Sequence, residues 1–177
     1  WQNVVVTMLF VVIVLLGVLF LSFKVLQVFN YLHVFPAQDF ASHLARLYFF
    51  KLHGFGVVPE WYNGFRLFDH YFPGFYFLGA PFLAMFGVRE SFVATVIAVW
   101  VLSGAGLLFF YKTFRGSLNG FFGFLVWLLA NPLSVMAFFV FGRVPELLAW
   151  AFFFFGFGLL WTYLDKQLDA RFYWIIP

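Results

Sequence analysis

Four polar side chains share one face of the helix that we predict over residues 39–53. At about 100° per residue, Asp39, His43, Arg46 and His53 fall within about 40° of one line along that helix. A carboxylate and an imidazole can move a proton, a guanidinium can pair with a phosphate, and imidazoles with carboxylates can hold a metal. This face is therefore the first candidate for a functional site.

The pair Asp39 and His43, four residues apart, leaves three interpretations open. They can be a general base with its orienting partner, two metal ligands, or a hydrogen-bonded pair that only stabilises the helix. Imidazole and carboxylate without thiolate suit Zn, Cu, Fe or Mn, and the chain has no cysteine. His53 and the adjacent Asp69 and His70 add further donors for such a site. A divalent metal cofactor therefore remains open.

Arg143 and Glu146 flank a proline near the start of a later apolar segment. Ionisable side chains at a membrane boundary are costly unless they are paired or face a cavity. Arg143, like Arg46, can bind a phosphate through two parallel hydrogen bonds. A functional site and a purely structural ion pair are both consistent with this arrangement. Glu60 is a further single acid, in the loop that precedes the second apolar segment.

The composition is typical of a membrane protein. Hydrophobic residues make up 65% of the 177 residues and charged residues only 10%, against roughly 45–50% and 25% in soluble domains. The mean hydropathy of +0.99 excludes a soluble globular domain. Ten basic and seven acidic residues are spread along the chain, without the basic block that nucleic acid binding needs. The expected partner is the lipid bilayer, not nucleic acid.

Apolar segments of about 20 residues predict four or five membrane-spanning helices, and hence an all-α, polytopic fold. The first covers residues 4–23 and is uncharged. A long loop over 24–70 follows, in which the helix 39–53 lies in the membrane interface and ends at Gly54. Further transmembrane helices occupy 71–164. Their expected ranges are 71–88, 91–111, a segment that starts near 118 and meets Pro132, and 145–164.

The ends of the chain and its charges bear on its organisation and orientation. We expect residues 1–177 to form one membrane domain of a longer protein, because another apolar run begins at 174–177. With five spans, eight of the ten basic residues lie on the side of the 24–70 loop, and Arg89 and Arg143 lie on the other. The positive-inside rule then places that loop in the cytoplasm.

Several short motifs, in a constant order relative to the apolar segments, resemble a known membrane family. The motifs are Asp39-x-x-x-His43-Leu44-x-Arg46, Pro59-x-Trp61-x-x-Gly64, Tyr71-Phe72-Pro73-Gly74-Phe75-Tyr76 and Gly142-Arg143-x-Pro145-Glu146. Together they resemble the 6-pyruvoyl-tetrahydropterin synthase-related membrane domain, whose layout is similar to that of the GT-C glycosyltransferase superfamily. The resemblance covers most of the chain, as the amino-terminal part of a longer protein.

The resemblance implies an inverting membrane glycosyltransferase that moves a sugar from a polyprenyl-phosphate donor to an acceptor hydroxyl or amide. It implies Asp39 as the catalytic base, aided by His43. Arg46 and Arg143 would bind the donor phosphate, although some relatives use a divalent metal instead. It also implies that the 24–70 loop lies on the non-cytoplasmic side of a prokaryotic cell membrane, opposite to the charge count. Further site candidates are His53, Glu60, Asp69, His70 and Glu146.

Two other classes of function remain open. A noncatalytic subunit or scaffold of a larger membrane complex would use the loop to dock to other membrane subunits. A metal-binding membrane oxidoreductase subunit would use the histidines and acids of the same loop. A transporter is least favoured, because the predicted spans lack a central acid or lysine. Replacing Asp39 by Asn separates the classes, because a scaffold tolerates the change whereas a glycosyltransferase folds but loses turnover.

Overall fold

The computed structural model describes residues 2–31, 38–61, 64–113 and 142–163. These residues form six helices, and no strand is present among them apart from one isolated bridge between Val58 and Phe65. The predicted all-α class is therefore confirmed for the described part of the chain. The helices are α1 (Gln2–Tyr31), α2 (Gln38–His53), α3 (Leu67–His70), α4 (Gly74–Leu83), α5 (Val88–Thr113) and α8 (Val144–Tyr163).

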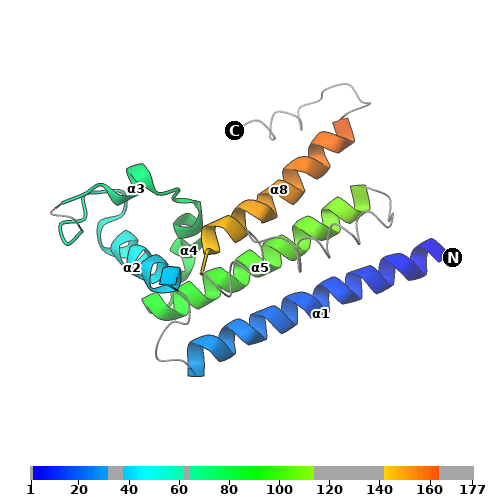
Figure 1. The fold of residues 1–177 in the computed structure, drawn as a ribbon, viewed down its shortest axis with the longest axis horizontal. Helices are drawn as coiled ribbons and strands as arrows, with labels where there is room; N and C mark the ends of the chain where they lie inside the picture. Colours follow the sequence, from blue (N-terminus) through cyan, green and yellow to red (C-terminus); the bar gives the residue numbers. More distant parts are fainter. Residues whose placement is uncertain (1, 32–37, 62–63, 114–141, 164–177) are drawn as a thin grey trace.

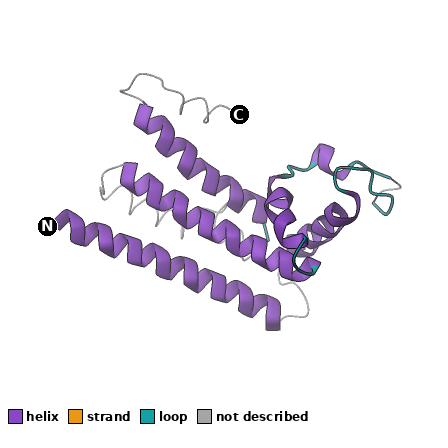
Figure 2. Cartoon of the chain, turned by 180° about the vertical axis from the view of Figure 1, so that it is seen from behind, coloured by secondary structure: helices purple, strands orange, loops and turns teal. Residues whose placement is uncertain are grey.

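The three long helices α1, α5 and α8 lie side by side (Figures 1 and 2), with α5 packed between the other two. α1 runs antiparallel to α5, and α8 runs parallel to it. The short helices α2, α3 and α4 gather at one end of this layer, where α1 ends and where α5 and α8 begin (Figure 1). Both α2 and α4 pack against α5. Segments far apart in the sequence therefore meet at this end of the layer.

Two of the helices, α5 over Val88–Phe110 and α8 over Val144–Tyr163, are long and apolar enough to cross a membrane. The helix predicted over 4–23 lies inside α1, whose apolar side chains are exposed at intervals from Val4 to Leu26. Exposed apolar surface of this extent is unfavourable in water and favours contact with lipid. The described helices thus agree with the predicted membrane location.

The membrane-spanning helix predicted over 71–88 is wrong. Its place is taken by α4, which has only 10 residues and contains Pro81. At about 1.5 Å per residue such a helix is about 15 Å long, half the thickness of the hydrocarbon core. The hydropathy pattern does not distinguish α4 from the turn that follows it, because both are apolar. The spans predicted over 91–111 and 145–164 correspond to α5 and α8, and the one starting near 118 lies outside the described residues.

The parallel course of α5 and α8 also changes which charges lie at the same end of the layer. Arg89 is the second residue of α5 and Arg143 directly precedes α8, so both lie at the α2 end, together with Arg46. Lys112 lies near the opposite end of α5. The count from the sequence puts Arg46 and Lys112 on one side of the membrane. It puts Arg89 and Arg143 on the other side. That grouping is wrong because it assumed one more crossing before α5.

The predicted interfacial helix is α2, and it has two distinct faces. Phe40, His43 and Leu47 are buried and follow one another at the three- and four-residue spacing of a helical face. Tyr48, on another side, is 47% exposed. The helix ends before Gly54, whose φ of 56° is a left-handed conformation that favours glycine. α2 thus turns His43 inward, towards the neighbouring helices.

Glycines bring α5 close to its neighbours. A Cβ atom added at Gly104 of α5 would lie 2.7 Å from Val18 Cγ2 of α1. A Cβ atom added at Gly79 of α4 would lie 2.9 Å from Thr95 Oγ1 of α5. Small residues at such contacts let helices approach and pack tightly within a membrane.

Replacing Gly106 by Ala should loosen the contact between α5 and α8. The new Cβ atom would lie 3.0 Å from the backbone carbonyl oxygen of Ala151, which cannot move without shifting α8. Overpacking of this kind costs about 1–3 kcal/mol. We expect a lower thermal unfolding midpoint in detergent for Gly106→Ala. The matched control is Gly156→Ala in α8, where nothing lies within 4 Å of the added atom; equal losses in both variants would contradict the predicted contact.

Candidate functional site

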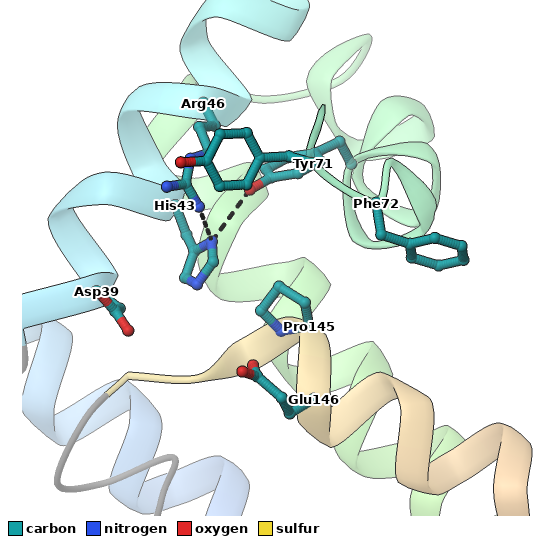
Figure 3. A pocket seen from close by; sticks show the side chains of 8 residues that line it. Asp39, His43, Arg46, Tyr71, Phe72, Pro145 and Glu146 are labelled. Carbon is teal, nitrogen blue, oxygen red and sulfur yellow. Dashed lines mark hydrogen bonds between the residues drawn. The ribbon is translucent and has the colours of Figure 1, made fainter. Parts of the chain in front are cut away.

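A cavity of about 280 Å³ lies where α2, α4 and the start of α8 meet (Figure 3). It combines charged, aromatic and polar side chains from segments about 100 residues apart. Four of the lining residues are sequence-predicted candidates, namely Asp39, His43, Arg46 and Glu146. The other lining residues are Tyr71, Phe72, Tyr76 and Pro145. The structure therefore brings four of the nine predicted candidates to one cavity.

His43 is buried in the wall of this cavity, with 6% of its surface exposed. Its Nδ1 lies 3.0 Å from the hydroxyl of Tyr76 and 3.4 Å from Nη1 of Arg46 (Figure 3). Burial, together with the positive charge of Arg46, lowers the pKa of His43 to about 4. Burial also raises the pKa of Tyr76 to about 12. Both side chains are therefore neutral at pH 7.

Arg46 is a cation whose donors are incompletely used. Its guanidinium carbon lies 3.8 Å from the centroid of the Tyr71 ring, in a cation–π contact. Its Nε is buried without a hydrogen-bond partner, and no carboxylate of the described residues pairs with the guanidinium. A guanidinium in this state can bind an anion such as phosphate through charge-assisted hydrogen bonds.

Asp39 and Glu146 supply two carboxylates to the cavity. Asp39 lies in the first turn of α2 and Glu146 in the first turn of α8, where the helix dipole stabilises negative charge. Figure 3 shows both carboxylates directed into the space between these helices. The hydrogen-bonded pair of Asp39 and His43, one of the three interpretations of their spacing, is not formed, and the His43 Nδ1 contacts Tyr76 and Arg46. Asp39 is thus left available to a ligand.

Two ion pairs hold other sequence-predicted candidates outside the cavity. His53 Nε2, at the end of α2, lies 3.2 Å from a carboxylate oxygen of Glu60. Arg66 Nη1 lies 3.9 Å from Asp69 Oδ2, and both of these side chains are exposed. These contacts join parts of the loop between α2 and α4. The structure therefore gives His53, Glu60 and Asp69 partners of their own, away from the cavity.

His70 and Arg143 also do not line the cavity. The ring of His70 stacks on Phe65, with centroids 4.7 Å apart and an angle of 18° between the planes. Arg143 is partly exposed and directly precedes α8, whose Pro145 and Glu146 do line the cavity. The sequence grouped Arg143 with Arg46 because both guanidinium groups can bind a phosphate and the family resemblance implies that role. The structure thus places Glu146 in the wall of the cavity and Arg143 outside it, directly before α8.

The described residues contain no group of three or more histidine and acidic side chains placed to hold a metal ion. Asp39 and Glu146 are two carboxylates of one cavity, but the neighbouring His43 directs Nδ1 to Tyr76. The loop histidines lie with other partners. The described side chains of the site therefore do not form a three-ligand metal centre by themselves.

The chain matches no family model, no curated protein and no solved structure. The assignment of the site therefore depends on its geometry. The likeness of its motifs to the 6-pyruvoyl-tetrahydropterin synthase-related membrane domain stays a prediction.

Sequence reasoning missed Tyr76, the direct partner of His43. It belongs to the aromatic run 71–76, which was noted as a motif but without a role for any single residue. A tyrosine 33 residues away carries no charge and no spacing that links it to a histidine. Only the packing of α4 against α2 reveals the contact.

His43 should make the stability of the protein depend on pH. Its pKa falls from 6.5 to about 4 on folding, so its contribution is complete above pH 6.5 and is lost progressively as the pH falls towards 4. The loss can reach about 3 kcal/mol. Replacing His43 by Asn keeps an acceptor for Tyr76 but removes the titration. We expect unfolding midpoints measured between pH 7 and pH 4 to fall less steeply in His43→Asn; parallel curves would contradict the shift.

Proposed function

We propose that this protein is a membrane transferase that moves a sugar from a polyprenyl-phosphate donor to an acceptor hydroxyl or amide. The observation that carries the proposal is the cavity at the α2 end. It combines Arg46, a cation without a carboxylate partner among the described residues, with the available carboxylates Asp39 and Glu146. It lies at the start of α8, a helix apolar and long enough to cross a membrane.

A second cavity supports a substrate with a lipid chain. It has a volume of about 290 Å³ and is lined by Glu146, Ala149, Trp150 and Phe153, which lie on one face of α8. Glu146 borders both cavities, so the polar cavity and the apolar one are neighbours at the start of this helix. A molecule with a phosphate head and an apolar chain matches this pair of cavities.

In this proposal Asp39 and Arg46 act at opposite ends of one displacement. The acceptor oxygen or nitrogen forms a bond to the anomeric carbon of the sugar while the bond from that carbon to the phosphate oxygen breaks. Asp39 receives the proton of the acceptor, and Arg46 stabilises the lipid phosphate that departs with the bonding electrons. Attack from the side opposite the leaving group inverts the anomeric carbon. Glu146 is placed to bind hydroxyl groups of the sugar.

The wider architecture belongs to the same proposal. We take the chain as the amino-terminal membrane domain of a GT-C-like protein, with four of the predicted spans in this part of it. The α2 end of the helix layer then faces the non-cytoplasmic side, where lipid-linked sugars would meet their acceptors. Arg143, beside the cavity at the start of α8, remains a proposed second contact for the donor phosphate.

Replacing Asp39 by Asn should abolish transfer without unfolding the protein. Asn keeps the size of the side chain but cannot accept the proton, which costs about 100-fold or more in rate. The assay uses the full-length protein in membranes with a panel of polyprenyl-phosphate sugars labelled in the sugar, and follows loss of lipid-extractable label. The matched control is Asp69→Asn, an exposed acid outside the cavity. Transfer at the wild-type rate in Asp39→Asn would favour the alternative, a noncatalytic membrane subunit.

Replacing Arg46 by Gln should weaken binding of a polyprenyl phosphate about tenfold or more, because charge-assisted hydrogen bonds to the phosphate are lost. Binding to the protein in lipid nanodiscs can be measured by native mass spectrometry. The control Arg66→Gln removes an arginine whose side chain is 66% exposed and outside the cavity, so it should leave the Kd unchanged. The corresponding polyprenol, which lacks the phosphate, should bind to both variants with the same Kd. Equal losses in both would contradict a phosphate site at Arg46.

A further inference from the structure

We infer that Tyr76 is a positioning residue that, together with Arg46, holds His43 with its ring proton on Nε2, so that His43 presents a hydrogen-bond donor to the cavity. His43 then serves as a donor to a substrate oxygen and not as a proton acceptor. The presence of a substrate oxygen near His43 rests on the proposed function. The position of the ring proton is independent of it, because it follows from contacts within the protein.

Two contacts on one nitrogen decide the tautomer. The Tyr76 hydroxyl and Arg46 Nη1 both approach Nδ1 of His43, at 3.0 Å and 3.4 Å. A hydroxyl can donate or accept, but a guanidinium has donors only. Nδ1 must therefore present its lone pair, since an N–H there would point at the N–H of the cation. A neutral imidazole with a free lone pair on Nδ1 carries its proton on Nε2.

The other edge of the ring faces the cavity. Figure 3 shows the His43 ring with its contacts to Tyr76 and Arg46 on one side and its opposite edge directed between Asp39 and Pro145. His43 is among the residues that line this space. A ligand oxygen in the cavity can thus accept a hydrogen bond from Nε2–H. Arg46 lines the same cavity from the other side of the imidazole, so a ligand with several oxygen atoms, such as a sugar phosphate, can accept from both.

Tyr76 is well suited to hold the imidazole in place. Its side chain is 1% exposed, and its ring packs edge-to-face against Phe68 with centroids 5.1 Å apart. The hydroxyl therefore cannot swing away from His43 without disturbing the core. A donor whose direction is set before the ligand arrives needs no reorganisation during the reaction.

The charged and titratable groups around the ring agree with this assignment. Asp39 and Arg46 face the cavity from α2, Glu146 faces it from α8, and Tyr71 borders it before α4. Only Arg46 among them makes a polar contact with the imidazole, and its positive charge opposes a second ring proton. Asp39 is then the base of the proposed reaction and His43 is a hydrogen-bond donor, although the two lie four residues apart on α2.

Nitrogen NMR of histidine-labelled protein in lipid nanodiscs tests the inference without any substrate. The His43 signals are identified by their loss in His43→Asn. We expect an unprotonated Nδ1 and a protonated Nε2, unchanged between pH 8 and pH 5.5. In Tyr76→Phe, which keeps the ring packing, we expect Nδ1 to stay unprotonated because Arg46 still faces it, but its signal to shift because the contact with the hydroxyl is lost. Tyr48→Phe, at an exposed position of α2, the helix that carries His43, should leave the spectrum unchanged.

Each result decides the matter. A proton on Nδ1, or a second proton gained by His43 near pH 6.5, overturns the assignment. An Nδ1 signal that is unchanged in Tyr76→Phe overturns the role of Tyr76. Because this experiment uses the protein alone, its failure is distinct from loss of the proposed transfer, which the Asp39→Asn assay reports.

Discussion

The close packing of α5 against its neighbours is the contact on which the rest of the described structure depends. α5 touches α1, α2, α4 and α8, so it sets their relative positions. Its buried hydroxyl groups make this possible, because Ser91, Thr95 and Ser103 each donate to the carbonyl oxygen four residues earlier, at 2.6–2.8 Å. Their polar atoms are thus satisfied internally while their small side chains leave room for the adjacent helices.

The course of the helices then determines the location of the site. α5 and α8 both begin where α2 and α4 pack, so the first turn of α8 meets the inner face of α2. That junction is the only place among the described residues where Glu146 can share a cavity with Asp39 and Arg46. The end of an apolar layer suits such a group of charges, since charges within the layer itself would have to be removed from water.

Burial separates the side chains of the site into two kinds. His43 and Tyr76 are almost fully enclosed, and burial keeps both neutral at pH 7. Asp39, Arg46 and Glu146 are only partly buried and border the open volume. In the proposed function the buried pair orients the site and these three side chains contact the substrate. Such an arrangement places prepared donors and acceptors where a polar head group can enter from the membrane boundary.

The sequence by itself determined the helical class, the membrane character and the extent of α2, α5 and α8, because hydropathy and helix-ending residues such as Gly54 act locally. It also identified Asp39, His43, Arg46 and Glu146 as candidates from their chemistry. Only the tertiary structure decided that these four converge, that His53, Glu60, Asp69, His70 and Arg143 do not, and that Tyr76 joins His43. Spacing within one helix predicts which side chains share a face, but not which partner each one contacts. The partner of each side chain depends on how α4 and α8, which lie far from α2 in the sequence, pack beside it.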